Sequence, residues 1–344
     1  MDFKTFLKSY DYKLPRELVA QVPASPRDSA RLLVYRRHSK KIEFDTFKSL
    51  AKYLPKGTVL VFNETKVLPA RFAVRKTTGG KVKLLYLNYH GGRVNVLCER
   101  RLESGTRLFV SEKKFFTVLN KTGSVYALTP SFSFAELKKI LNVKGEAPIP
   151  PYLRHTSLSD PQLRKVYQTV FAKNEGSAAA PTASLHFTKL LLKKLRVAGH
   201  TPQFVTLHVG LGTFAPLSEQ AIQSGKLHQE EYFISESVAA FLNQAKKSGR
   251  PIIAVGTTTA RTLESACIGG KIKKLKAATQ LFIREGYRFK FCDGLITNFH
   301  VPKSSLLMLV AALIGREKLL KIYRTAIKNN FRFFSFGDGM LICD

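Results

Sequence analysis

Short, uninterrupted hydrophobic stretches alternate with amphipathic stretches along most of the chain. One of them, Ile252–Val255, precedes Gly256, and the residues that follow place Ala260, Leu263 and Ala266 at helical spacing. A brief apolar run suits a strand covered on both faces of a sheet, and a period of 3.6 suits a helix packed on that sheet. The same reasoning predicts strands at 32–36, 42–44, 59–62, 204–209, 252–255, 295–299 and 331–336, and helices at 47–54, 134–142, 163–171, 185–198, 236–247, 259–267, 304–314 and 317–329. The pattern therefore predicts a layered α/β fold.

The pattern changes between residues 71 and 129. Short runs alternate there between apolar and polar positions, and glycine-containing turns separate them, at 82–87, 93–97, 107–110, 115–119 and 125–128. Strands at this spacing, with no helix between them, are typical of a small antiparallel barrel or sandwich. Because α/β patterning lies on both sides, we predict a discontinuous α/β catalytic domain at 1–63 and 150–344. A small antiparallel β-barrel domain is then inserted at 64–149.

The charge indicates a polyanionic partner. The chain has 344 residues, with Lys+Arg 56 against Asp+Glu 24, a net charge of +32. This excess is spread along the sequence, as expected of a folded body that contacts nucleic-acid phosphates. The helix predicted at 317–329 gathers basic residues on one face, and a second basic cluster follows Gly270. We expect these residues to contact RNA: Lys273, Lys274, Lys321, Arg324 and Lys328.

Several classes of protein are excluded by what the sequence lacks. The four cysteines lie far apart without a CxxC pair, so neither a zinc site nor a disulfide framework is predicted, and we expect no metal. The most apolar run, at 306–314, is too short to cross a bilayer, and the N-terminus has no secretory h-region. We expect a cytoplasmic protein, working as a monomer without a membrane.

The strongest candidate for anion binding is the start of the helix after Val255. A strand, a small-residue turn at Gly256 and a helix start leave backbone N–H groups free at the positive end of the helix dipole. Thr257, Thr258 and Arg261 lie in this first turn, so we expect a carboxylate or phosphate there. The alternative is a capped helix without a ligand.

Four histidines lie at predicted element boundaries beside Gly, Thr, Asn or Pro: His186, His208, His228 and His300. Histidine is the natural group for moving protons near pH 7. After His208, Gly210 and Gly212 form a glycine turn, with Glu230 about twenty residues further on. This resembles the nucleotide turn of an S-adenosylmethionine-dependent methyltransferase, in which Glu230 would hold the ribose. No P-loop, GxSxG elbow or HExxH motif occurs.

Long, ordered motifs then resemble one family, the S-adenosylmethionine:tRNA ribosyltransferase-isomerases of queuosine synthesis, from about residue 11 to the end. They include LPRELVAQVPASPRDSARLL, VLVFNETKVLPARF, IPPYL, YQTVFAKNEGSAAAPTASLHFT, FVTLHVGLGTFAPL, HQEEY, AVGTTTARTLES, GYRFKFCDGLITNFHVPKSSLLMLV and RFFSFGDGMLI. Ser184 stands where the family pattern has Gly, and Leu211 where it has Ala. The resemblance implies an α/β domain with an inserted barrel. It also implies transfer and isomerisation of the ribosyl group of S-adenosylmethionine, a co-substrate, onto the 7-aminomethyl-7-deazaguanine base at the tRNA wobble position. The products that the resemblance implies are epoxyqueuosine-tRNA, adenine and methionine.

This chemistry assigns expected roles to the candidate residues. A base must remove the proton of the ribose carbon beside the sulfonium, an acid must meet the departing adenine, and the attacking amine must be neutral. We expect base and acid among the four histidines, with Glu230 and Asp338 as alternates. Other groups are expected to bind substrate: Thr257, Thr258 and Arg261 the methionine carboxylate; Gly210, Gly212 and Thr213 the nucleotide; Asp293 and Asn298 ribose hydroxyls or base edges; Phe299 or Tyr287 the sulfonium. A tRNA or rRNA methyltransferase and a non-catalytic RNA-binding module remain alternatives.

Overall fold

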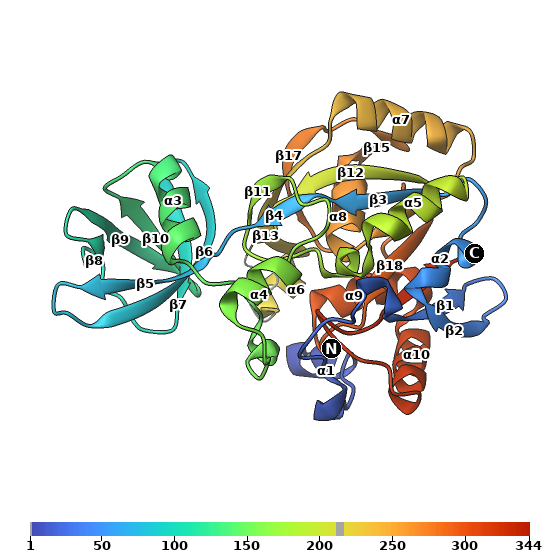
Figure 1. The fold of residues 1–344 in the computed structure, drawn as a ribbon, viewed down its shortest axis with the longest axis horizontal. Helices are drawn as coiled ribbons and strands as arrows, with labels where there is room; N and C mark the ends of the chain where they lie inside the picture. The colour runs from blue at the N-terminus through green and yellow to red at the C-terminus, as the bar shows by residue number, and fades with distance from the viewer. Residues whose placement is uncertain (1, 211–216) are drawn as a thin grey trace.

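The structure is a computed structural model, and it describes residues 2–210 and 217–344. Two bodies are visible in Figure 1: a large sheet covered by helices, and a small barrel at the left of the view. The expected nucleotide-binding residues Gly212 and Thr213, as well as Leu211, lie outside the described residues.

Nine strands of the described residues form the large sheet, in the order β17-β13-β12-β3-β14-β18-β19-β1-β2. Their bounds are β1 (Arg31–Arg36), β2 (Ile42–Thr46), β3 (Val59–Asn63), β12 (Thr201–Leu207), β13 (Lys226–Phe233), β14 (Ile252–Val255), β17 (Lys276–Leu281), β18 (Gly294–Asn298) and β19 (Gly339–Cys343). Neighbours β12, β3, β14 and β18 run parallel, so their carboxyl ends share one edge. In α/β sheets, ligands bind outside such an edge.

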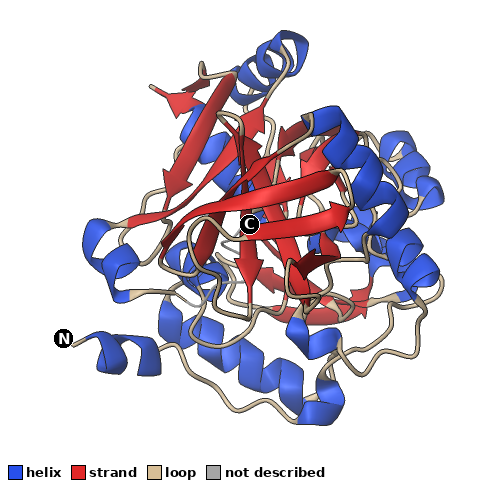
Figure 2. Ribbon diagram, turned by 90° about the vertical axis from the view of Figure 1, so that its left-hand side faces the viewer, coloured by secondary structure: helices blue, strands red, loops and turns tan. Residues whose placement is uncertain are grey.

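Helices cover both faces of the sheet because the central strands are apolar on both sides (Figure 2). On β3, Val59 and Val61 join the core on one face, and Leu60 and Phe62 join the core on the other. The first face is covered by α7 (Glu236–Lys247), α8 (Thr257–Ala266), α9 (Ser305–Ile314) and α10 (Arg316–Lys328), and the second by α2 (Leu50–Tyr53) and α5 (Lys189–Val197). This confirms the predicted layered α/β fold.

The barrel predicted from the alternating runs is also confirmed. It closes in the order β10-β7-β6-β5-β8-β9. Its elements are β5 (Arg71–Lys76), β6 (Lys81–His90), β7 (Arg93–Cys98), β8 (Arg107–Ser111), β9 (Lys114–Thr122), β10 (Val125–Pro130) and the following helix α3 (Phe134–Lys144). Leu137 and Leu141 of α3 pack on the barrel core, and Ser133 with Glu136 forms a capping box that fixes where the helix begins.

Shorter elements complete the chain. They are α1 (Phe3–Lys8), α4 (Asp160–Val166), α6 (Glu219–Ser224), the pair β4 (Thr65–Val67) and β11 (Asn174–Ser177), the pair β15 (Cys267–Ile268) and β16 (Lys271–Ile272), and 3-10 turns at Arg16–Leu18, Arg27–Ser29, Phe47–Ser49, Pro151–Leu153 and Thr182–His186. Strand β4 leads from the end of β3 toward the barrel (Figure 1), so the carboxyl edge of the sheet faces the barrel.

One predicted strand is wrong. Residues 331–336 form a turn, and β19 follows at Gly339–Cys343. Phe333 makes a single bridge to Val19, and Phe334 adopts a φ of 71°, which a strand does not allow. The helices predicted at 47–54, 163–171 and 185–198 are shorter than expected, because parts of each are 3-10 turns or irregular. No helix in the described ranges has the length and apolarity needed to span a membrane.

Candidate active site at the carboxyl edge of the sheet

Asn63, at the end of β3, joins the segments that build the site. This fully buried side chain donates to Leu207 O at 2.9 Å and, at 3.4 Å, to the Thr258 hydroxyl, and its oxygen accepts from the backbone N–H groups of Thr65 and Leu207. An amide with both groups satisfied in this way locks its neighbours in place. The ends of β3 and β12, the start of α8 and the start of β4 are therefore held together.

A first cavity opens between the ends of β14 and β18. It is lined by Tyr152, Tyr167, Ala180, Pro181, Thr182, Ala183, Val209, Gly256, Thr257, Thr258, Thr297, Asn298, Phe299, His300, Val301, Leu306, Phe334 and Ser335. Six predicted site residues meet here: Gly256, Thr257, Thr258, Asn298, Phe299 and His300. None of the described lining residues carries a formal charge when His300 is neutral.

The start of α8 faces this cavity without a side-chain cap. Gly256, at φ 97°, is the N-cap residue, and no described side chain caps the helix. Thr259 turns its hydroxyl back to Val255 O at 2.9 Å, whereas Thr257 and Thr258 line the cavity. Uncapped backbone N–H groups at a helix start attract anions.

Asn298 and His186 form a buried pair beside the cavity. The Asn298 amide N–H donates to His186 Nε2 and to Phe334 O, both at 3.2 Å, and its Oδ1 accepts from no described group. His186 stacks on Phe47, with ring centroids 4.2 Å apart. Burial first, and then the charges of Arg332 and Arg27, lower the pKa of His186 to about 3. His186 is therefore neutral and lies behind Asn298 rather than among the lining residues.

His300 lines the cavity directly. Its Nε2 lies 2.7 Å from the Thr297 hydroxyl, and its backbone N–H donates to the Tyr323 hydroxyl at 2.9 Å. Burial lowers the pKa of His300 to about 3, so it too is neutral at pH 7.

A second cavity lies between the sheet and the barrel. Its lining comes from β6, β7 and α3 on one side and from β11, β13 and the segment after β12 on the other: Tyr86, Leu87, Asn88, Tyr89, His90, Asn95, Phe134, Glu175, Gly176, His208, Gly210, Gln229, Glu230 and Glu231. Tyr89 and Phe134 stack with centroids 4.5 Å apart. In a chain of net charge +32, the described lining holds three glutamates and neither lysine nor arginine.

The segment 208–210 separates the two cavities, since Val209 lines the first and its neighbours line the second. His208 Nδ1 lies 2.8 Å from the Thr65 hydroxyl, and burial lowers the pKa of His208. The ring packs directly on Gly176, where a Cβ atom would lie 2.9 Å from it. A larger residue at 176 would therefore displace His208.

Glu230 and Arg261 form a buried ion pair. Arg261 Nη1 donates to Glu230 Oε2, and the other carboxylate oxygen accepts from Gly210 N at 3.1 Å. Arg261 Nε donates to Leu281 O at 3.1 Å. The structure therefore turns Arg261 toward β13, away from the cavity that Thr257 and Thr258 line. Both oxygens of Glu230 thus accept hydrogen bonds from the protein, and the residue lines the second cavity rather than the cavity of Thr257 and Thr258.

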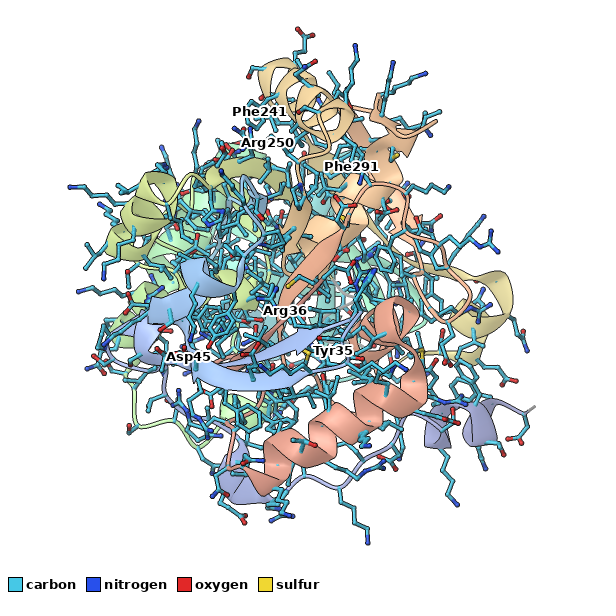
Figure 3. The ribbon with its side chains drawn as sticks, turned by 90° about the vertical axis from the view of Figure 1, so that its right-hand side faces the viewer. Tyr35, Arg36, Asp45, Phe241, Arg250 and Phe291 are labelled. Atoms are coloured by element: carbon cyan, nitrogen blue, oxygen red, sulfur yellow. The ribbon has the colours of Figure 1, made fainter. Side chains whose placement is uncertain are left out.

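Other predicted residues lie apart from both cavities. His228 is exposed on β13. Asp293 binds Lys246 Nζ at 2.6 Å and accepts from Ile252 N, so it lies at the amino edge of the sheet. That edge belongs to the face turned away from the barrel, where Arg250 lies over Phe241 (Figure 3).

Asp338 and Tyr287 also have structural partners. The Asp338 carboxylate accepts from the backbone N–H groups of Arg31 and Arg332, at 2.9 and 2.7 Å, and closes the turn before β19. Tyr287 donates to Glu264 at 2.9 Å. Phe299 does line the first cavity, at the edge of an aromatic core cluster.

The predicted RNA-binding residues are all exposed: Lys273, Lys274, Lys321, Arg324 and Lys328. On α10 the buried residues Leu319, Ile322, Tyr323 and Ala326 occupy the opposite face, which confirms the predicted amphipathic helix. Helix α10 and the strand β17 beside Lys273 and Lys274 lie on opposite sides of the sheet body (Figure 1), so they are two separate surfaces.

Several lining residues were missed from the sequence. Tyr152 and Ser335 form a 2.8 Å hydroxyl pair on the wall of the first cavity, and the Tyr167 hydroxyl has no described partner. The second cavity was missed altogether, because its walls come from both bodies. The motif containing Tyr152 was the available signal, yet a lone tyrosine after a proline pair carries no chemistry by itself. Among the described residues, no group of three or more metal-ligating side chains occurs.

Comparisons with known proteins agree with this architecture. Residues 7–342 match a family described as queuosine biosynthesis protein. The chain is 47% identical to the S-adenosylmethionine:tRNA ribosyltransferase-isomerase of Carboxydothermus hydrogenoformans, covering 98% of this chain and 99% of the relative. It is 44% identical to the enzyme of the same name from Caldanaerobacter subterraneus, covering 96% and 98%. A crystal structure of S-adenosylmethionine tRNA ribosyltransferase from Thermotoga maritima aligns with a TM-score of 0.55 and 32% identity, covering 97% of this chain and 99% of that one. The chain therefore belongs to the queuosine biosynthesis protein family, as a transferase of the ribosyltransferase-isomerase type.

Proposed function

We propose that this enzyme transfers and isomerises the ribosyl group of S-adenosylmethionine onto the 7-aminomethyl-7-deazaguanine base at the wobble position of tRNA. Epoxyqueuosine-tRNA forms, and adenine and methionine leave. The observation that carries the proposal is the pair of adjoining cavities at the carboxyl edge, which differ in chemistry and share the wall at 208–210.

The first cavity suits S-adenosylmethionine. The uncapped start of α8 at Thr257 and Thr258 offers backbone donors to the methionine carboxylate. The rings of Tyr152 and Phe334, with centroids 4.8 Å apart, form an aromatic wall that attracts a sulfonium by cation–π interaction. His300 is neutral and lines the same cavity, which supports a role in exchanging a proton with the ribose or the departing adenine.

The second cavity suits a flat base that carries an amine. Glu230 is engaged by Arg261, and Glu175 pairs with Lys66 at 2.8 Å. Among the described residues, Glu231 pairs only with His90, at 3.6 Å, and its side chain stays accessible. Glu231 can therefore attract the ammonium form of the aminomethyl group. His208 then accepts the proton of that ammonium. Where the two cavities adjoin at 208–210, the freed lone pair forms the new C–N bond to the ribose, while the bonds from the ribose to adenine and to the methionine sulfur break.

One incubation tests this proposal. The protein is mixed with tRNA carrying the precursor base and with S-adenosylmethionine labelled in the adenine and methionine parts. Chromatography is expected to show free adenine and methionine in equal amounts with the modified base. S-adenosylhomocysteine would instead indicate a methyltransferase, and unconsumed donor with bound tRNA would indicate a binding module.

The basic face of α10 is proposed to contact tRNA phosphates. Reversing two charges by Lys321→Glu and Arg324→Glu is expected to lower the salt dependence of tRNA binding, because each phosphate contact adds about 0.9 to the slope of log K against log salt. Filter binding at several salt concentrations measures the slope. The matched control is Lys193→Glu with Lys194→Glu, two exposed lysines of α5 that are not among the predicted RNA-binding residues. An unchanged slope in the α10 variant would mean that the basic face of α10 contacts solvent and not tRNA phosphates.

A further inference from the structure

We propose that the first cavity contains a subsite for an α-ammonium group, formed by Asn298 Oδ1, and that His186 is the positioning residue that aims it. The ligand is the zwitterionic head group of an α-amino acid, carried by S-adenosylmethionine before the reaction and by methionine after it. The inference rests on the proposed function for the identity of the donor, and it adds a role for two buried residues.

The orientation of the Asn298 amide follows from its partners. A carboxamide has two N–H donors and one oxygen acceptor. Both donors are used, on His186 Nε2 and Phe334 O at 3.2 Å each, so the oxygen remains. Asn298 is 2% exposed and lines the cavity, and its Oδ1 accepts from no described group. Buried acceptors in proteins are rarely left unpaired, so a donor on a ligand is the missing partner.

His186 can hold this orientation only as a hydrogen-bond acceptor. The ring is buried, stacks on Phe47 and is neutral. Phe334 O can only accept, so the Asn298 atom that contacts both Phe334 O and His186 is the amide nitrogen, and His186 Nε2 is the unprotonated ring nitrogen that accepts from it. A protonated or missing imidazole would let the amide turn, and the amide nitrogen would then take the place of the Oδ1 acceptor. His186 is not among the cavity-lining residues, so its effect is exerted through Asn298.

The surroundings favour an ammonium beside a carboxylate. Gly256 N donates to Ile296 O at 2.8 Å, so the start of α8 and the end of β18 are immediate neighbours. The same cavity is therefore lined by carboxylate donors, at Thr257 and Thr258, and by an ammonium acceptor, at Asn298. This matches an amino acid, in which the carboxylate and the ammonium are attached to one carbon. The described lining carries no formal charge, which suits a head group of zero net charge.

The test compares two ligands that differ only in the amine: L-methionine and 4-(methylthio)butanoate. Each competes with labelled S-adenosylmethionine for the wild-type protein, and L-methionine is expected to bind about tenfold more tightly because a hydrogen bond to a charged donor is lost in its analogue. In Asn298→Ala this preference is expected to vanish. Equal competition by the two ligands in the wild type would overturn the proposal, as would a preference that survives in the variant.

His186 is tested with two replacements. His186→Leu removes the acceptor and is expected to lower the preference for L-methionine, whereas His186→Gln supplies an amide oxygen in the same place and restores it. A sulfonium nucleoside without the amino acid, 5′-deoxy-5′-(dimethylsulfonio)adenosine, is expected to bind all variants equally. If the variants lost as much affinity for this nucleoside as for L-methionine, Asn298 and His186 would have a merely structural role. These binding assays need no tRNA. A failure to detect ribosyl transfer would therefore leave the subsite proposal intact, and a failed subsite test would leave the proposed ribosyl transfer intact.

Discussion

Replacing His208 with glutamine is expected to lower the rate of ribosyl transfer by about 10²- to 10⁴-fold, the range typical of a lost general base. Affinity for S-adenosylmethionine is expected to stay the same, because His208 lines the second cavity and not the first. Glutamine keeps a polar contact with the Thr65 hydroxyl, which lies 2.8 Å from His208 Nδ1, but it cannot accept a proton at neutral pH. Single-turnover rates and equilibrium binding separate the two effects.

The pH profile gives an independent check on the role of His208. Burial lowers its pKa from the ordinary 6.5, so the neutral, proton-accepting form persists below that pH. The wild-type rate is expected to fall only as pH drops through this lowered pKa. The residual rate of His208→Gln is expected not to show this fall at acidic pH. His155→Gln, at an exposed histidine, is the matched control. A full rate in His208→Gln would remove His208 from the mechanism.

Acid is expected to destabilise the protein strongly, because His186 and His300 are buried in the neutral form. Each has its pKa lowered from 6.5 to about 3. Below pH 6.5 the unfolded chain takes up a proton at each site while the folded chain does not, so stability is lost as pH falls toward 3. The expected loss is about 1.4 kcal/mol per pH unit for each histidine. Between pH 6 and 4.5 this is about 2 kcal/mol each, against total stabilities of about 5–15 kcal/mol.

Urea unfolding at pH 7, 6, 5 and 4.5 measures this loss. Carboxylates also titrate in this range, so the informative quantity is the difference between the wild type and single variants. His186→Gln and His300→Gln are each expected to reduce the slope of unfolding free energy against pH by about 1.4 kcal/mol per unit. His155→Gln should leave the slope unchanged. Identical slopes in all four proteins would show that neither buried histidine is neutral.

Much of the fold was predictable from local patterns. The strand at 252–255 and the helix at 236–247 match the structure residue for residue. In both, the spacing of the apolar residues is typical of one element type only, and the same is true of the amphipathic α10. The aromatic run at 331–336 has the composition of a strand but forms a turn, because the Asp338 carboxylate accepts from Arg332 N within the run and from Arg31 N at the start of β1, and Phe334 takes a left-handed conformation. Tertiary contacts outweighed β-propensity there.

The candidate site was predictable in its parts and not in its grouping. The sequence indicated that helix starts and strand ends carry the chemistry, and Thr257, Asn298 and His300 do share a cavity. The sequence did not indicate that His208 and Val209, which follow the end of β12, line different cavities. The sequence predicted that Arg261 binds a ligand. In the structure Arg261 instead pairs with Glu230, 31 positions away in the chain.

By itself, then, the sequence determined the strands, the helices, the barrel and the basic character, because periodicity, turn residues and net charge are local or additive properties. Only the tertiary structure decided which polar groups form hydrogen bonds with each other and which remain available to bind a ligand. Glu230 and Asp338 are satisfied inside the protein, whereas Asn298 Oδ1 is not satisfied by any described group. That difference depends on distances between residues remote in the chain, and a buried polar group is defined by its partners rather than by its neighbours in sequence.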